Sequence, residues 1–222
     1  MIDLPLFAEL FSSIKHCRLF IVGDENQLPP IGIGKSFVEM IGKMNKIALT
    51  KVHRQNQGKI LHYATQIKDG VIPHIVTGDG VEIYSTFNIN MLNDMLHTDW
   101  QIIIPKKAGE VGTEELNLRI QSHLGIETNG KFGVGERIFI TQNNYDLSVF
   151  NRDVGVVTEI KPNDVIVEID EKKVTIPKTL NIVELGYAIT IHKSQGSGYD
   201  SVMLILDSTT PPPMRIRSIL FT

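Results

Sequence analysis

Residues 19–32, LFIVGDENQLPPIG, join an apolar run to a loop that carries acids, amides and two prolines. The run 19–22 has the composition of a buried strand, and ligands in open α/β sheets gather beyond the carboxyl ends of such strands. The prolines at 29–30 fix φ at both positions and so stiffen the loop. The stretch predicts a site that holds Asp24 and Gln27 in place, and the alternative is a rigid turn that binds nothing.

Two hydrophobic spacings alternate along much of the chain. Helical spacing predicts helices over 4–15, 37–44 and 60–67, and short apolar runs predict strands over 17–23, 46–52 and 100–105. The run 17–23 is too uniformly apolar for a half-exposed strand, so we expect it to be buried. Strands that alternate with helices indicate an α/β fold with a mainly parallel sheet flanked by helices.

The pattern changes near residue 135 to short β-rich runs separated by turn residues. Four such runs follow one another, at 136–142, 153–160, 164–170 and 172–177. They predict a small antiparallel β-barrel or a meander. The α/β pattern returns with 185–196 and with a buried strand at 201–207. The simplest interpretation is a compact β module inserted into an α/β domain.

The composition excludes several classes of protein. The 222 residues are 42% hydrophobic, which is ordinary for a globular protein, and no apolar run approaches the roughly 20 residues that span a bilayer. The net charge of −3 argues against a protein that coats nucleic acid through a general basic surface, but it allows a narrow channel with a few basic residues. The histidines lack metal-ligand spacing, so we expect no metal site.

The start of the chain and its cysteine content predict a cytoplasmic protein. The first residues, MIDLPLFAEL, have no basic segment and include Asp3 and Glu9, so we expect no secretory signal. Cys17 cannot form an internal disulfide, which fits a reducing compartment. Its neighbours have strand composition, so we interpret Cys17 as core filler rather than as a reactive thiol.

Polar residues with chemical capacity cluster at three places. Asp24 and Gln27 follow the first apolar run, and Arg54 follows a later one. The third cluster precedes Gly196 and consists of Thr190, His192, Lys193, Ser194 and Gln195. Arginine commonly stabilises charge on a transferred phosphoryl group, and hydroxyls, amides and lysine bind nucleic-acid phosphates. Taken singly, an arginine is usually a surface charge and a histidine is usually a hydrogen-bonded structural residue.

Together and in this order, the clusters resemble a known family. GDENQLPPIGIG at 23–34, LTKVHRQ at 49–55 and YAITIHKSQGSGYD at 187–200 are similar to three successive motifs of superfamily-one DNA helicases of the RecD/TraA-like branch. The stretches 100–121 and 134–157 are similar to two connecting segments of the same branch. The resemblance covers nearly the whole chain, and it implies RecA-like domains with a small inserted β-barrel.

The resemblance implies a nucleotide site. Gln27 corresponds to the glutamine that senses the terminal phosphate of ATP, and Asp24 corresponds to the acid of the same motif. Arg54 corresponds to the arginine that reaches this phosphate across the cleft between two RecA-like domains, and Gly196 to a phosphate-proximal glycine. Of these four residues, Gln27 and Arg54 are the predicted catalytic members.

The third motif implies contact with DNA. Thr190, His192, Ser194 and Gln195 match a motif that lies along single-stranded DNA, and Lys193 within it is a further candidate contact. Outside this motif, two aromatic residues flank the entry to the β module, Tyr145 and Phe150. They either stack on bases or simply pack the barrel.

Several departures from the family accompany the resemblance. Gly198 stands where the family has a glutamate that contacts ribose. The 222 residues contain no GxxxxGK[ST] phosphate cradle and no Asp-Glu pair ahead of the first helix. The final residues 215–222 begin like the last family motif and stop before its second arginine. We therefore interpret the chain as an internal or truncated piece of a longer helicase, and we expect it to bind no ATP or Mg²⁺ by itself.

The resemblance also implies a domain plan and a function. The plan is a remnant of the first RecA-like domain at 1–46, the second RecA-like domain at 47–150 and 184–222, and the inserted barrel at 151–183. The intact parent resembles the alpha subunit of exodeoxyribonuclease V, which implies ATP- and Mg²⁺-dependent 5′-to-3′ movement on single-stranded DNA and unwinding of duplex DNA. The implied partners are DNA and either nuclease subunits or a fused relaxase, with no membrane. The alternative is a non-catalytic DNA-binding or scaffold module with helicase architecture.

Overall fold

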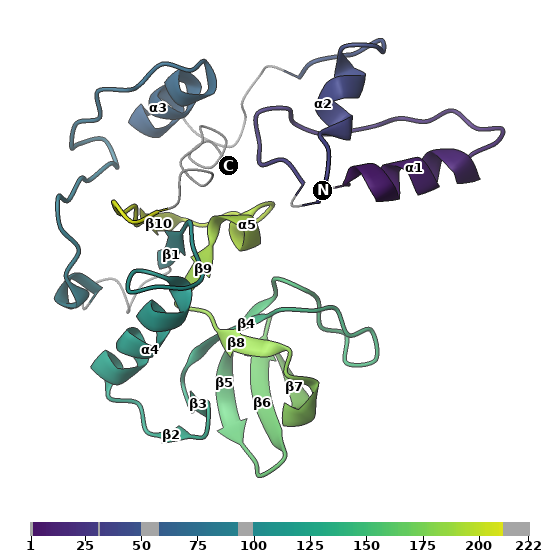
Figure 1. Cartoon of the computed structure of the whole chain (residues 1–222). Coiled ribbons are helices and arrows are strands. Elements are labelled where there is room, and N and C mark those ends of the chain that lie inside the picture. Colours follow the sequence, from purple (N-terminus) through teal and green to yellow (C-terminus); the bar gives the residue numbers. More distant parts are fainter. Residues whose placement is uncertain (1, 31, 50–57, 93–99, 211–222) are drawn as a thin grey trace. The chain divides into compact units, whose positions relative to one another are not determined.

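The computed structural model describes residues 2–30, 32–49, 58–92 and 100–210. They divide into two compact units, one within residues 1–85 and one within residues 86–214 (Figure 1). The predicted domain boundaries at 46, 150 and 183 concern family domains and stay predictions. None of the helices in the described stretches is long and apolar enough to cross a membrane.

The first unit contains three short helices near the positions that hydrophobic spacing predicted. They are α1 (Leu4–Ser13), α2 (Ser36–Ile41) and α3 (Lys59–Lys68). Asp3 caps α1, because its Oδ1 accepts a hydrogen bond from the amide of Leu6 at 3.1 Å. Tyr63 of α3 is buried, and its hydroxyl accepts a hydrogen bond from the amide of Val76 at 3.1 Å. That bond holds the segment after α3 against the helix.

The prediction of a buried strand at 17–23 is wrong. These residues form no strand, and Phe20 and Val22 are 85% and 95% exposed. Cys17 is exposed as well, so it is not core filler. Residues 46–49 likewise form no strand, and the rest of that predicted element lies outside the described residues. A strand needs a neighbouring backbone to pair its N–H and C=O groups, and no described strand pairs with either segment.

The second unit is built on a three-stranded parallel sheet. Its strands are β1 (Trp100–Ile104), β9 (Ala188–Thr190) and β10 (Ser201–Leu204), in the order β10-β1-β9. Helix α4 (Thr113–Leu124) packs against β9 (Figure 1). Buried Asn117 joins them, since its side chain donates to the carbonyl of Ala188 at 2.9 Å and accepts from its amide at 2.8 Å. The predicted parallel α/β arrangement is confirmed in this unit, but the strand predicted to be buried at 201–207 is shorter and half-exposed, since β10 ends at Leu204 and Val202 is 43% exposed.

The predicted β-rich runs form four strands of a five-stranded antiparallel sheet. Its strands are β4 (Arg137–Ile140), β5 (Val154–Ile160), β6 (Asp164–Ile169), β7 (Lys172–Pro177) and β8 (Val183–Leu185). The order is β7-β6-β5-β4-β8, and all neighbours are antiparallel. The smaller elements of this unit are η1 (Ile89–Leu92) and the hairpin of β2 (Thr128–Asn129) and β3 (Phe132–Gly133).

This sheet is open, so the predicted closed barrel is not observed. After β7 the chain passes through the turn η2 (Lys178–Leu180) and returns to pair β8 with β4. Strands β7 and β8 therefore remain at opposite edges of the described sheet, and the meander is the arrangement that forms. The sheet also includes β4, which precedes the predicted insert at 151–183.

One hydrophobic core joins the two sheets of the second unit. Ile104 and Ile120 from the α/β part belong to the same buried cluster as Ile138 and Val167 from the antiparallel sheet, and none of the four is more than 1% exposed. Protein interiors are close-packed and transmit displacement. The antiparallel sheet is therefore held firmly enough to position side chains beside the parallel sheet.

Candidate functional site

Polar residues of the second unit gather at one edge of the parallel sheet. Strands β1, β9 and β10 run in the same direction, so their carboxyl ends meet at this edge. Lys106 follows β1, the one-turn helix α5 (Ile191–Ser194) follows β9, and Asp207 follows β10. Such an edge is where open α/β sheets bind ligands. The predicted DNA-binding cluster at 190–195 lies here.

Thr190 and Ser194 shape α5 through hydrogen bonds to its backbone. Thr190 is the N-cap, and its Oγ1 accepts from the amide of Lys193 at 3.3 Å. Ser194 is buried, and its Oγ donates to the carbonyl of Ile191 at 2.9 Å. A capping hydroxyl keeps its own hydrogen, so Thr190 is able to donate to a phosphate oxygen. The hydroxyl hydrogen of Ser194 is used within the helix.

His192 is half-buried on α5 and carries no charge at neutral pH. Burial lowers the pKa of His192 below its ordinary value of 6.5. A neutral imidazole donates one hydrogen bond and accepts one, but it offers no positive charge to a phosphate. The predicted DNA contact of His192 is therefore a hydrogen bond rather than an ion pair.

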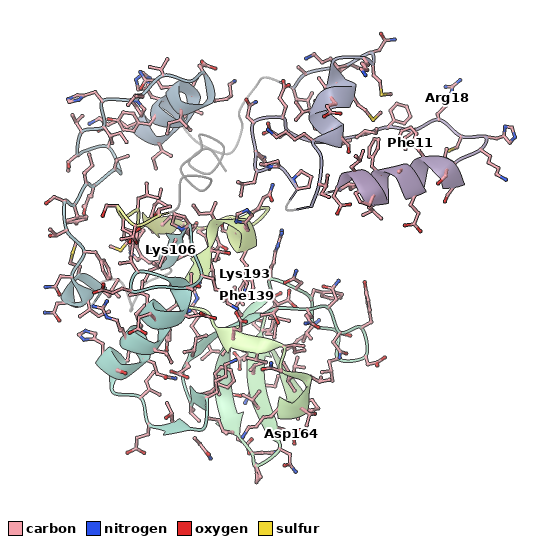
Figure 2. All side chains as sticks on the ribbon, viewed as in Figure 1. Phe11, Arg18, Lys106, Phe139, Asp164 and Lys193 are labelled. Atoms are coloured by element: carbon pink, nitrogen blue, oxygen red, sulfur yellow. The ribbon has the colours of Figure 1, made fainter. Side chains whose placement is uncertain are left out.

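The ammonium group of Lys193 lies against the antiparallel sheet. Its Nζ is 2.7 Å from Oε2 of Glu184 and 5.0 Å from the ring centroid of Phe139 (Figure 2). Burial favours a raised pKa for Glu184, but the hydrogen bond and charge of Lys193, followed by the charge of Lys107, outweigh it and lower the pKa. Glu184 is therefore ionised at neutral pH, and it pairs with Lys193.

The loop after α5 is fixed at its backbone. The carbonyl of Gln195 accepts a hydrogen bond from Nη1 of Arg152, and the amide of Ser197 donates to the carbonyl of Ser194 at 3.0 Å. Gly196 has a φ of +88°, in the left-handed region that favours glycine. The sequence therefore needs glycine at 196 for the turn itself, whether or not a phosphate approaches.

Gly198 has open space around it. A Cβ atom added there would have no other atom within 4 Å, apart from its chain neighbours. The resemblance expects a glutamate at this position, and the backbone leaves room for one. The absence of that side chain is therefore not a packing requirement of this loop.

In the first unit, the structure brings Asp24 and Gln27 together. Oδ1 of Asp24 accepts from the amide of Asn26 at 2.9 Å, and its Oδ2 accepts from Nε2 of Gln27 at 3.2 Å. A Cβ atom at Gly23 would lie 2.7 Å from the ring of Phe37, so glycine is required for this close approach. Both predicted residues are exposed, and Asp24 orients the amide of Gln27.

Arg54 lies outside the described residues, so its partnership with Gln27 stays a prediction. The two units are each described by themselves, and the predicted joining of Gln27 and Arg54 with Gly196 is likewise a prediction. Within the described stretches, no group of three or more His, Cys, Asp or Glu side chains is placed to hold a metal ion.

The aromatic residues at the β module face solvent. Tyr145 and Phe150 are 76% and 47% exposed, and their ring centroids lie 6.1 Å apart at an interplanar angle of 76°. Neither ring is buried in the antiparallel sheet, so the alternative that they pack a barrel is wrong. Stacking of bases on these rings stays a prediction.

Several known proteins are similar to this chain in sequence or in fold. Residues 1–85, which coincide with the first unit, match the family model described as AAA domain. The chain is 26% identical to the RecBCD enzyme subunit RecD of Mycolicibacterium smegmatis, over 94% of this chain and 44% of that protein. It is 27% identical to the ATP-dependent RecD2 DNA helicase of Deinococcus radiodurans, over 92% of this chain and 31% of that protein. The crystal structure of Pif1 helicase from Bacteroides with ADP-AlF3 and ssDNA covers 89% of this chain with 58% of its own, at a TM-score of 0.57 and 18% identity.

The chain is a relative of the superfamily-one helicases of the RecD/TraA branch. It spans less than half the length of the two curated relatives named above. The likeness to the Pif1 structure shows a common fold.

Two charged residues at the same edge of the parallel sheet, Lys106 and Asp207, were not predicted from the sequence. Lys106, labelled in Figure 2, is 9% exposed. Its Nζ donates to Oδ2 of Asp207 at 2.8 Å and to Oγ1 of Thr209. Burial favours a raised pKa for Asp207, but hydrogen bonds from Lys106, Thr209 and Thr210 outweigh it and hold the pKa well below its usual range. This pair joins the ends of β1 and β10. The sequence did contain a signal for Lys106, because this lysine directly follows the predicted strand at 100–105. The same kind of position, after a predicted strand, was the reason for selecting Asp24.

Proposed function

We propose that the chain is the C-terminal motor part of an ATP-dependent DNA helicase that resembles the alpha subunit of exodeoxyribonuclease V. The parent couples ATP hydrolysis to 5′-to-3′ movement on single-stranded DNA and so unwinds duplex DNA. The observation that carries this proposal is the position of residues 190–196, a helicase-like motif at the carboxyl edge of a parallel sheet. The relative named as an ATP-dependent DNA helicase supports it.

The nucleotide role of the chain rests on three residues. Gln27, oriented by Asp24 at 3.2 Å, suits an amide that positions a water or contacts a terminal phosphate. Arg54 supplies charge to the phosphoryl group in transfer. The 222 residues contain no GxxxxGK[ST] cradle, so binding of ATP and Mg²⁺ is proposed for the parent and not for this chain alone. There, ATP supplies the free energy that drives movement.

On the DNA side, Thr190 and His192 supply hydrogen bonds and no charge. Contacts of this kind to the phosphate backbone hold a strand without reading its sequence. Binding should therefore tolerate any sequence. We place this activity in the cytoplasm, with nuclease subunits as partners, because one relative is named as a RecBCD subunit. A fused relaxase is the alternative partner.

A second candidate function is a non-catalytic DNA-binding or scaffold module. Such a module would use the contacts of residues 190–195 with DNA and would need no nucleotide site. The two functions differ in one measurable property, which is ATP turnover by the parent in the presence of single-stranded DNA.

The test measures ATP hydrolysis and unwinding by the parent on duplexes with a 5′ or a 3′ single-stranded tail. We expect DNA-stimulated hydrolysis, and unwinding of the 5′-tailed duplex only. The 222-residue chain in the same assay should show no turnover, because the missing groups supply most of the electrostatic stabilisation in phosphoryl transfer. DNA binding by the parent without hydrolysis would favour the scaffold function.

A further inference from the structure

Two side chains join the loop 190–196 to the antiparallel sheet and its connecting segment. Lys193 reaches the sheet from α5, and Arg152 reaches the loop from the segment between β4 and β5. Both contacts lie within the second unit. The motif resemblance counts Lys193 among the DNA contacts and gives Arg152 no role, whereas the contacts of both side chains point elsewhere.

Lys193 sits over a matched pair on the sheet. Phe139 and Glu184 are direct partners in the register of β4 and β8, and direct partners in an antiparallel pair place their side chains on the same face. The Nζ of Lys193 contacts both, at 5.0 Å from the ring centroid and 2.7 Å from the carboxylate. The side chains of Lys193 and Glu184 are only 32% and 36% exposed, so solvent screens the pair incompletely. A cation held in this way has little left to offer a phosphate.

Arg152 is held in a costly backbone conformation. Its φ is +85°, a left-handed value that is strained for any residue other than glycine. The backbone around it holds this geometry, since its amide donates to the carbonyl of Ile140 at 2.8 Å. From there its guanidinium donates to the carbonyl of Gln195. Strain of this kind persists only where the surroundings enforce it, and here the strained residue reaches the loop.

We propose that Lys193 and Arg152 are positioning residues, which anchor the single-strand loop 190–196 to the antiparallel sheet, and that Lys193 does not contact DNA phosphate. This inference rests on the proposed DNA contact of the loop. It gives the antiparallel sheet a task, because Lys193 is held by residues of β4 and β8, and Arg152 lies in the segment between β4 and β5. A displacement of that sheet moves the DNA-contacting residues with it.

The two possible roles of Lys193 give opposite results for one substitution in the parent. If Lys193 is an anchor, Lys193→Met and Glu184→Gln each weaken single-strand binding several-fold and to a similar extent. The double variant then binds single-stranded DNA no more weakly than either single variant. The slope of log affinity against log salt stays unchanged. As a phosphate contact, Lys193→Met lowers that slope by about one, and Glu184→Gln tightens binding because it releases the cation. The second pattern would overturn the proposal.

Two further variants sharpen this measurement. Exchanging the charges in a Lys107→Met background, with Lys193→Glu and Glu184→Lys together, should restore part of the lost affinity if the ion pair is what matters. The background is needed because Lys107 lies 3.9 Å from the Glu184 carboxylate and would repel a lysine at that position. No recovery beyond Lys193→Met would count against the anchor. The matched control is Lys172→Met, which removes the same charge from an exposed position on β7 of the same unit. It should leave affinity unchanged.

A DNA-independent measurement tests the anchors separately. Hydrogen exchange of the backbone amides at 193–197 should speed up in Lys193→Met and in Arg152→Gly without any DNA present. Glycine accepts a φ of +85° without strain, so Arg152→Gly should keep its melting temperature while the loop exchanges faster. Unchanged exchange in both variants would overturn the inference. A parent that binds no single-stranded DNA would instead overturn the proposed function, and the exchange data would still decide on the anchors.

Discussion

The segments 19–32 and 188–200 share a plan, in which an apolar run leads into a polar helicase-like motif, but their environments are opposite. Ile189 is 2% exposed inside the parallel sheet, whereas Phe20 and Val22 are 85% and 95% exposed. Strand β9 has β1 beside it and α4 packed on it, while the earlier run pairs with no described strand. Strand composition therefore fixes neither pairing nor burial, because the neighbours supply both.

The polar halves of the two segments differ in the same way. In the loop 23–32, Asp24 accepts hydrogen bonds from Asn26 and Gln27, which are only two and three positions away along the chain. In the loop 190–196, Lys193 and Gln195 are held by residues of the antiparallel sheet and its connecting segment. A motif on a paired strand is thus tied to distant elements, which is what allows it to respond to their movement.

The largest expected effect concerns Arg54, the predicted partner of Gln27 at the phosphate, and it separates the nucleotide motifs from the DNA motif by function. In the parent, Arg54→Ala should slow ATP hydrolysis by about 10³-fold or more, because an arginine at the transferred phosphoryl group is worth that much where measured. Single-strand affinity should stay nearly unchanged. Steady-state hydrolysis rates and titration of a labelled oligonucleotide check this. Hydrolysis at the parental rate would show that the motif correspondence at this position is mistaken.

Gln27→Ala in the parent should leave DNA binding intact while DNA-stimulated hydrolysis and unwinding fall together. The expected loss is smaller than for Arg54→Ala, because an amide orients the reaction without supplying full charge. The control is Asn26→Ala, in the same turn. A variant that loses DNA affinity along with hydrolysis would place Gln27 on the DNA side instead.

Two substitutions to alanine, one in each apolar run, test the contrast in burial. Ile189→Ala should lower the free energy of unfolding of the second unit by about 2–5 kcal/mol, the usual cost of truncating a buried isoleucine. Val22→Ala, on the exposed run, should change the free energy of unfolding of the first unit by less than about 0.5 kcal/mol. Urea unfolding of the 222-residue chain measures both. A large loss in Val22→Ala would mean that the first run is covered in solution.

Removing two side chains from the second motif tests its DNA role. His192→Ala combined with Ser194→Ala should weaken single-strand binding by the parent by about tenfold, because it removes the hydrogen bond that His192 offers to DNA and the bond from Ser194 to the Ile191 carbonyl that holds α5. The loss should be equal on poly-dT and on mixed sequence, since backbone contacts carry no sequence information. Titrations at two salt concentrations should show a modest salt slope. Unchanged affinity would leave this stretch a structural hinge.

The smallest expected effect is a pH dependence that only the second segment should show. The pKa of His192 is lowered in the folded state from its ordinary value of 6.5, so well above that pH both states are neutral and stability is flat. As the pH falls below that value, the unfolded state binds a proton that the folded state resists. The free energy of unfolding should then decrease by at most about 1.4 kcal/mol per pH unit. Melting curves from pH 8 to 5.5 measure this, and His192→Gln should flatten the dependence.

The sequence predicted those features that depend on spacing along the chain. Helices near 4–15 and 60–67 and the four β-rich runs follow from periodicity, which is local. The open sheet could not be predicted, because the choice of β4 as the partner of β8 depends on where the turn at 178–180 sends the chain. Spacing alone therefore specified the strands but not their closure.

Within the candidate site, residue type was informative and orientation was not. The residue types and their order singled out Thr190 as a DNA contact, and the structure adds that its hydroxyl caps α5. The direction of Lys193 does not, because Glu184 and Phe139 become its neighbours only after β8 pairs with β4. Arg152 gave no sequence signal, since its importance comes from a backbone angle.

The unpaired edge of the antiparallel sheet at β7 bears on whether the protein aggregates at high concentration. An unpaired edge strand is a template for pairing between molecules, and positively charged side chains on that edge oppose such growth. On β7, Lys172 and Lys173 are exposed, so two molecules that meet edge to edge there repel each other. The run 19–22 has no charged side chain of its own and exposes Phe20 and Val22. In a concentrated preparation, association between molecules should therefore begin at the run 19–22. The lysines of β7 should oppose pairing between the edges of two sheets.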